Sequence, residues 1–314
     1  MASFIFALSA ITPLLIYLLI GYTLKARSLL SQLTAKELNS LCYRLFLPAS
    51  LLLNSYRSDL SFKAAGSVVL FALAGVTAVF LLAWLIYRRT EPNDGRKASL
   101  IQNAFRSNTA LFGLPLSQLI LGGKDNGITA LLVTAVIPLY NILAVVVLSS
   151  YSDKSKSFSH IIRGIVTNPL IIGTLAGFTL KKLPCLNLPE ALLKPLGGLA
   201  GLATPLALIV LGAQFEFKES QSIKKQLVGG VITRLVLVPG LLLGLAVLIG
   251  FRQESLVGLL VTFASPTAVS AYTMAREMGA DHKLMGQLLV YTTVFSCLSL
   301  FGFIFALRAL GLIS

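Results

Sequence analysis

Residues 103–123 read NAFRSNTALFGLPLSQLILGG, and this stretch decides how the rest of the chain can fold. It lies in an apolar region long enough to cross a bilayer, yet it carries an arginine, a short polar run, and then Gly113 and Pro115. Because proline lacks an amide proton, Pro115 is expected to leave the carbonyl of Leu111 without its helical partner. An unpaired carbonyl is costly in lipid. The stretch therefore predicts either a kink, with that carbonyl met by a nearby hydroxyl, or a broken helix lining a protein cavity.

The composition indicates a polytopic membrane protein. Of the 314 residues, 56% are hydrophobic and only 12% charged, and the mean hydropathy is +0.84; soluble domains carry roughly 25% charged residues. The net charge of +14 does not indicate nucleic-acid binding, because the basic residues lie mostly in short segments between apolar runs. The three cysteines form no metal-binding pattern, and no P-loop motif is present. No cofactor, metal site or nucleic-acid partner is expected.

Apolar runs of about 20 residues predict ten membrane-spanning helices. The first run lacks a basic leading region and is long for a signal core, so we expect a span there and not a cleavable signal peptide. The expected spans are residues 3–24, 37–55, 64–87, 98–122, 127–150, 161–180, 191–214, 225–250, 254–278 and 283–309.

The two halves of the chain resemble each other. TPLLIYLLIGYTLK (12–25) aligns without gaps to NPLIIGTLAGFTLK (168–181) at a shift of 156 residues, which is 169 − 13. The alignment pairs proline with proline, lysine with lysine, and Gly21 with Gly177. Matched proline, glycine and lysine at one offset are hard to obtain by chance in apolar sequence. We therefore infer an internal repeat.

Each half holds five expected spans, an odd number, so the second half would enter the membrane from the opposite side. We expect a five-span repeat over residues 1–150, a short connecting loop over 151–160, and an inverted five-span repeat over 161–314. Loops at one face carry 15 basic residues and loops at the other carry 8. The positive-inside rule then places the face with 15 basic residues in the cytoplasm and both termini outside.

The counterpart of the opening stretch is residues 255–279, SLVGLLVTFASPTAVSAYTMAREMG. Here Pro266 is expected to free the carbonyl of Thr262. The two prolines are not in strict register, since 115 + 156 is 271, five residues beyond Pro266. Two proline-interrupted helices at corresponding places in inverted halves are typical of a substrate site at the membrane midplane.

AFRSNTALFGLPL and FASPTAVSAYTMAREMGAD resemble the auxin efflux carrier family, in its bacterial, malonate-transporter-like branch, with a distant relation to the bile-acid symporters. The resemblance covers essentially the whole chain. It implies an all-α fold of ten transmembrane helices, in which the fourth and ninth are broken and cross where an organic anion binds. Carried onto this sequence, the crossover residues are Asn108, Gly113 and Pro115 in the first half and Ser265, Pro266 and Thr267 in the second.

Three arginines lie within expected spans, each about 12 Å from the span's start. No acidic residue lies deep in a span to pair with them, so they are expected either to form a positive vestibule that draws anions inward or to snorkel to lipid phosphates. Helix N-termini after the breaks would also face an anion, and nearby hydroxyls and amides would bind it or cap their own helices. The expected substrate-binding residues are Arg106, Asn108, Thr109, Gly113, Pro115, Ser265, Pro266 and Thr267, with Arg44 and Arg234 in the vestibule.

These features predict a secondary carrier of a small organic anion, such as a carboxylate or auxin-like compound, that works by alternating access. A Na⁺-coupled bile-acid-type symporter and a non-transporting sensor on the same fold remain alternatives. An enzyme is not expected, because no cluster of His, Asp, Glu or Cys has catalytic spacing. A homodimer is left open.

The coupling ion is expected to be H⁺ or Na⁺. The freed carbonyls of Leu111 and Thr262 are candidates for Na⁺. His160 and His282 fall in loops and are expected to be solvated and not to relay protons. The weak candidates for a proton are Asp59, together with Arg57, and Asp125 and Asp281.

Overall fold

The computed structural model describes residues 2–57, 66–109, 116–117, 120–121, 127–151, 166–182, 188–214 and 223–313. Within these ranges all extended regular structure is helical, apart from one isolated β-bridge. Among the described residues, five helices are long and apolar enough to cross a membrane: Gly66–Thr90, Gly127–Ser150, Glu190–Gln214, Lys224–Ile249 and His282–Ala309. These helices support the prediction of a polytopic membrane protein.

In the first half the elements are α1 (Ala2–Ala26), α2 (Gln32–Leu41), the π-helical turn η1 (Cys42–Phe46), α3 (Leu47–Arg57), α4 (Gly66–Thr90), α5 (Asp94–Phe105) and α7 (Gly127–Ser150). In the second half they are α9 (Pro169–Lys182), α10 (Glu190–Gln214), α11 (Lys224–Ile232), the π-helical turn η4 (Thr233–Leu237), α12 (Val238–Ile249), α13 (Gln253–Ala264), α14 (Val269–Glu277) and α15 (His282–Ala309). The expected spans 98–122 and 254–278 are both interrupted. In them α5 ends at Phe105 and α13 ends at Ala264.

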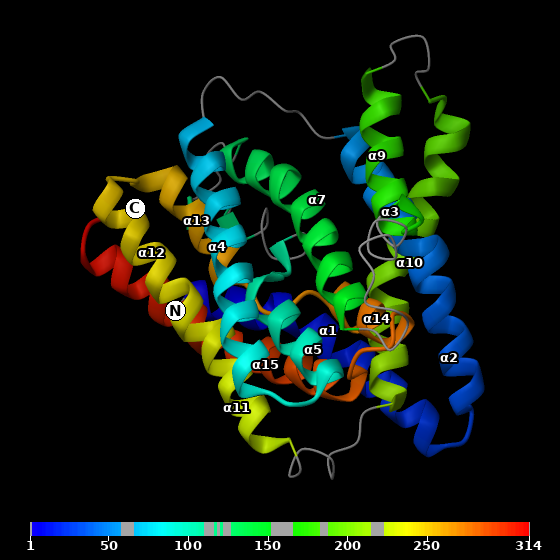
Figure 1. The fold of residues 1–314 in the computed structure, drawn as a ribbon. Coiled ribbons are helices and arrows are strands. Elements are labelled where there is room, and N and C mark those ends of the chain that lie inside the picture. The colour runs from blue at the N-terminus through cyan, green and yellow to red at the C-terminus, as the bar shows by residue number, and fades with distance from the viewer. Residues whose placement is uncertain are drawn as a thin grey trace.

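The helices form two groups (Figure 1). In one group α1, α2, α3, α9 and α10 pack on one another, with the closest associations between α1 and α10 and between α3 and α9. The other group contains α4, α5, α7, α11, α12, α13, α14 and α15. The groups meet where α1 crosses α15 and where α14 lies against α10. The largest buried apolar cluster lies mostly in the second group and extends to Leu170 and Ile171 of α9.

Glycines allow the helices of the first group to approach closely. A Cβ atom at Gly212 of α10 would overlap the carbonyl oxygen of Leu18 on α1, and one at Gly21 would overlap the backbone of Ile209. On α9, a Cβ atom at Gly177 would overlap the carbonyl oxygen of Leu52. Gly21 and Gly177, which the internal repeat pairs, therefore both lie where two helices touch backbone to backbone.

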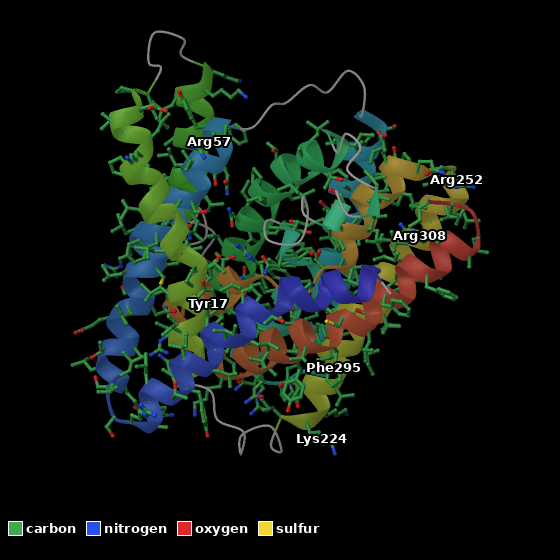
Figure 2. The ribbon with its side chains drawn as sticks, turned by 180° about the vertical axis from the view of Figure 1, so that it is seen from behind. Tyr17, Arg57, Lys224, Arg252, Phe295 and Arg308 are labelled. Atoms are coloured by element: carbon green, nitrogen blue, oxygen red, sulfur yellow. The ribbon has the colours of Figure 1, made fainter. Side chains whose placement is uncertain are left out.

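Basic side chains lie towards both ends of the molecule. Figure 2 shows Arg57 and Arg252 towards one end and Lys224 at the opposite end. Three expectations stay predictions: the end that faces the cytoplasm, the inversion of the two halves, and the count of ten crossings.

Candidate functional site

Two extended segments cross at the centre of the second helix group. After α5 ends at Phe105 and α13 ends at Ala264, the backbone is extended. The amide of Asn108 donates to the carbonyl oxygen of Pro266 at 2.8 Å, and the amide of Ala268 donates to that of Arg106 at 3.2 Å. These two bonds form an antiparallel bridge centred on Ser107 and Thr267. Each segment thus satisfies backbone groups that the other helix leaves without partners.

The interruption of the first half starts earlier than Pro115. Helix α5 ends at Phe105, so the extended backbone starts nine residues before that proline (115 − 106). Gly113 and Pro115, like the carbonyl of Leu111, lie outside the described residues. No proline is needed at Arg106 because pairing with the other segment replaces the lost helical hydrogen bonds.

Arg234, on the π-helical turn η4, binds the carbonyls at the ends of both half-helices. Its Nη1 donates to the carbonyl of Ala104 at 3.0 Å, and Nη2 donates to that of Phe263 at 3.0 Å. Nε and Nη2 both donate to the carbonyl of Ser265, at 3.0 and 2.8 Å. The residue is 1% exposed. A cation is favourable here because the C-terminal ends of α5 and α13 carry partial negative charge.

Side chains satisfy further carbonyls near Pro266. The Ser265 hydroxyl donates to the carbonyl of Val261 at 2.6 Å. The Tyr140 hydroxyl donates to the carbonyl of Thr262, the one expected to be freed by Pro266, at 3.4 Å. The carbonyl of Thr262 therefore accepts a hydrogen bond from the protein and is not free to bind Na⁺.

A cavity of about 100 Å³ lies beside the crossing and between the two helix groups. Its described lining includes basic and neutral polar side chains but no acidic residue. The polar lining residues are Ser50, Asn54, Arg106, Ser107, Asn108, Thr109, Tyr140, Asn141, Thr204 and Ser270. The apolar ones are Leu47, Leu51, Ile137, Leu170, Ala203, Ala268 and Val269.

Arg106 is the one described basic residue in this lining, and it is 4% exposed. Its Nη2 donates to Asn141 Oδ1 at 2.7 Å and to Ser270 Oγ at 2.9 Å, and its Nη1 donates to the carbonyl of Tyr140 at 3.1 Å. All three partners are neutral. A buried guanidinium with only neutral partners keeps its positive charge uncompensated, which favours an anion nearby.

Three buried polar atoms of the lining have no hydrogen-bond partner among the described residues. They are Nε of Arg106, Nδ2 of Asn141 and Oγ1 of Thr109. The two nitrogen atoms are donors and the hydroxyl can donate. Helix α14 also begins at this cavity, since its first residues Val269 and Ser270 line it, and a helix N-terminus carries partial positive charge. The cavity therefore offers donors and positive potential to an acceptor-rich ligand.

Other predicted site residues lie elsewhere. The Thr267 hydroxyl donates to Asn103 Oδ1 at 2.6 Å, and Asn103 Nδ2 donates to the carbonyl of Gly230 at 2.9 Å. The described lining includes Asn108 and Thr109 but not Ser265, Pro266 or Thr267. The latter three build the crossing, while Ala268, Val269 and Ser270 supply that half's surface to the cavity.

The three arginines do not form one vestibule. Arg44 is exposed and lines a different pocket with Tyr43 and Asn168, and Arg234 is held by carbonyls. Only Arg106 reaches the cavity at the crossing. Their equal depth in sequence did not distinguish these surroundings, because the neighbours come from distant segments.

Sequence reasoning missed Asn141, Ser270, Asn54 and Thr204 as cavity residues. Asn141 gave a usable signal: it is a polar amide in the middle of the strongly apolar run 127–150. Such residues in a span usually face the protein interior. Ser270 and Thr204 gave none, because small hydroxyl residues bond their own helix without difficulty.

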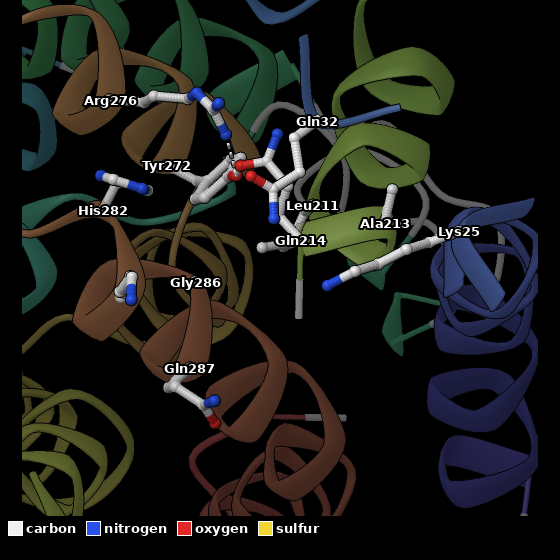
Figure 3. A pocket seen from close by; sticks show the side chains of 11 residues that line it. Lys25, Gln32, Leu211, Ala213, Gln214, Tyr272, Arg276, His282, Gly286 and Gln287 are labelled. Carbon is white, nitrogen blue, oxygen red and sulfur yellow. Dashed lines mark hydrogen bonds between the residues drawn. The ribbon is translucent and has the colours of Figure 1, made fainter. Parts of the chain in front are cut away.

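The coupling candidates give little support for a proton site. Asp281 lies 3.3 Å from Arg96 Nε and caps α15 by accepting from the amide of Leu284. His160, Asp59 and Asp125 lie outside the described residues. His282 lines a second cavity of about 220 Å³, beyond the other end of α14 (Figure 3). There Arg276 Nη1 donates to the Tyr272 hydroxyl at 3.2 Å, which donates to Gln214 Oε1 at 2.7 Å.

The model of the family described as membrane transport protein matches residues 6–304. The chain belongs to this family. The resemblance to the auxin efflux carriers is thereby confirmed, and the malonate-transporter-like branch stays a prediction. As a member of the membrane transport protein family with several long apolar helices, the chain is a multi-pass membrane protein.

Two relatives of similar length are described as uncharacterized transporters. One, from Methanothermobacter thermautotrophicus, is 26% identical over 304 residues, covering 92% of this chain and 95% of the relative. The other, from Methanocaldococcus jannaschii, is 26% identical over 316 residues, covering 92% of this chain and 96% of the relative. The likeness extends over nearly the whole of each chain.

Proposed function

We propose that this membrane transport protein is a secondary carrier of a small organic anion, which binds in the cavity beside the crossing. The observation that carries the proposal is the guanidinium of Arg106. It is buried, lines the cavity, and has only neutral partners and an unpartnered Nε among the described residues. A carboxylate at Nε would compensate this charge and accept a charge-assisted hydrogen bond.

The rest of the lining supports a carboxylate. Asn141 Nδ2 and the Thr109 hydroxyl can donate and have no acceptor among the described residues, and the N-terminus of α14 adds positive potential. Leu51, Ile137 and Leu170 offer apolar contact to the remainder of the ligand. A cavity of about 150 Å³ holds benzene, so the present volume of about 100 Å³ favours a short-chain carboxylate over a compound of auxin size.

The arrangement of helices supports alternating access. The cavity lies between the two helix groups, so sliding one group against the other would change the side from which it opens. We further propose that the chain makes ten crossings as two inverted repeats, with both termini outside a bacterial cytoplasmic membrane. A single-cysteine variant at Ser28, in the loop between α1 and α2, should then react with an impermeant thiol reagent only from the cytoplasmic side.

Flux and binding measurements on reconstituted protein test the carrier. Acetate, malonate, succinate, benzoate and indole-3-acetate should be compared for uptake into proteoliposomes. Uptake of at least one short carboxylate should saturate, and Arg106→Gln should abolish both its uptake and its stabilising effect on the purified protein. Arg106→Lys, which keeps the charge, should retain weak binding.

The matched control is Arg88→Gln, at the exposed C-terminal turn of α4, which should leave uptake unchanged. Uptake by Arg106→Gln equal to that of the wild type would contradict the site. Saturable binding with no flux under any ion gradient would instead favour the sensor.

A further inference from the structure

The second buried arginine, Arg234, has a set of partners different from those of Arg106. All its described hydrogen bonds go to main-chain carbonyl oxygens, those of Ala104, Phe263 and Ser265, at 2.8 to 3.0 Å. No carboxylate pairs with it in the part of the chain that the structure describes. Its charge is therefore balanced by peptide dipoles alone.

These three carbonyls belong to the C-terminal ends of two interrupted helices. Ala104 is in the last turn of α5, Phe263 is in the last turn of α13, and Ser265 follows it directly. Both helix ends point their partial negative charge at the same place. Converging carbonyls of unwound helices are a set of ligands that transporters use for Na⁺.

We propose that the guanidinium of Arg234 is a built-in cation, which fills the carbonyl site where an interrupted helix pair would otherwise bind a coupling Na⁺. Bound Na⁺ and Arg234 then exclude each other there. The crossing is held together in the absence of any free cation. If Arg234 occupies the carbonyl site, anion transport needs no Na⁺ there. This consequence for transport rests on the proposed carrier function.

The geometry of the side chain suits this role. Nε and Nη2 of Arg234 both donate to the carbonyl of Ser265 at the end of α13, while Nη1 donates to the carbonyl of Ala104 in α5. A planar guanidinium can bridge two helix ends in this way, whereas an ammonium presents its donors from one point. Arg234 lies in the π-helical turn η4, and such turns inside α-helices occur frequently at functional sites.

Removing the Arg234 side chain and adding a soluble guanidinium in its place tests the proposal. The thermal unfolding midpoint of the purified full chain should be measured in NaCl, KCl and choline chloride at equal ionic strength. The wild type should unfold at the same temperature in all three salts. Arg234→Ala should unfold at a midpoint roughly 5–10 °C lower, and methylguanidinium chloride should recover part of that loss.

Arg252→Ala is the matched control, because Arg252 also donates to main-chain carbonyls, those of Val247 and Phe251, but is exposed. Methylguanidinium should not raise its midpoint. If Arg234→Ala does not fold, Arg234→Lys gives the same test: it should unfold below the wild type and regain stability with methylguanidinium.

A Na⁺-specific rise in the wild-type midpoint that Arg106→Gln retains would overturn the proposal. So would equal midpoints for Arg234→Ala and the wild type, or a lower midpoint that methylguanidinium does not raise. Because the readout is stability, a wild type that transports no anion would contradict the carrier but not this result.

Discussion

The amide of Asn108 lies 2.8 Å from the carbonyl oxygen of Pro266, and this hydrogen bond joins two helices that are interrupted in different halves of the chain. The side chain of Asn108 is not needed for the bond and lines the cavity. Backbone and side chain of one residue therefore have separate roles, the first in holding the crossing and the second in lining the cavity.

Replacing Asn108 by two different residues separates these roles. Asn108→Ala keeps the amide, so it should leave the thermal midpoint unchanged and weaken carboxylate binding by about tenfold, the effect of losing one hydrogen bond. Asn108→Pro removes the amide and should lower the midpoint as well. Titration calorimetry and thermal unfolding measure the two effects. Wild-type affinity in Asn108→Ala would move the ligand away from this side chain.

Asn141→Asp should abolish anion binding. Asn141 Oδ1 accepts from Arg106 Nη2 at 2.7 Å, so a carboxylate there would neutralise the guanidinium from within the protein. The loss should reach about a hundredfold or more, since an added anion then meets no net positive charge. Asn141→Ala is the comparison and should bind better than Asn141→Asp. Undiminished binding by Asn141→Asp would contradict the role given to Arg106.

Thr267→Val should act on stability and not on affinity. The Thr267 hydroxyl donates to Asn103 Oδ1 at 2.6 Å, and both residues are fully buried. Valine keeps the shape but leaves that oxygen unpaired, at a cost of about 1–3 kcal/mol. Thermal unfolding measures the loss. Thr179→Val, an exposed threonine whose hydroxyl bonds its own helix, should change the midpoint little.

The sequence located the crossing but not its partners. The polar residues and prolines that interrupt two apolar runs identified residues 103–123 and 255–279. Arg106 and Asn108 line the cavity beside the crossing, and their binding of a substrate stays a prediction. Thr267 and Ser265 were expected to bind the ligand, yet their hydroxyls bond Asn103 and Val261. Which way a hydroxyl points depends on tertiary neighbours that a single segment does not specify.

Arg234 is a second residue whose partners could not be predicted from its own segment. Its partner Ala104 lies 130 residues away in sequence, and nothing local at either position predicts the pairing. The sequence places Arg44, Arg106 and Arg234 at the same depth in their spans, but their surroundings differ. Arg234 is held by carbonyls, Arg106 lines the cavity beside the crossing, and Arg44 lies in an exposed pocket. Depth follows from counting along one helix, but surroundings follow from how helices pack.

Gly212→Ala should destabilise the association of α1 and α10. A methyl group at this position would overlap the carbonyl oxygen of Leu18, so the two backbones would have to separate. We expect a loss of about 1–3 kcal/mol, seen as a lower midpoint. Gly201→Ala, on the same helix with open space around it, is the control and should be neutral or slightly stabilising. Equal midpoints for the two variants would contradict the close approach.

The bridge between Ser107 and Thr267 also bears on how the protein is made. The two residues are 160 positions apart (267 − 107), so the ribosome completes one side of the bridge long before the other exists. A chain that stops short of α13 has no second segment to pair with residues 106–108, so the amide of Asn108 and the carbonyl of Arg106 lose these partners inside the bilayer. Truncated or half-inserted copies are thus penalised energetically in the bilayer until both halves of the chain are in place.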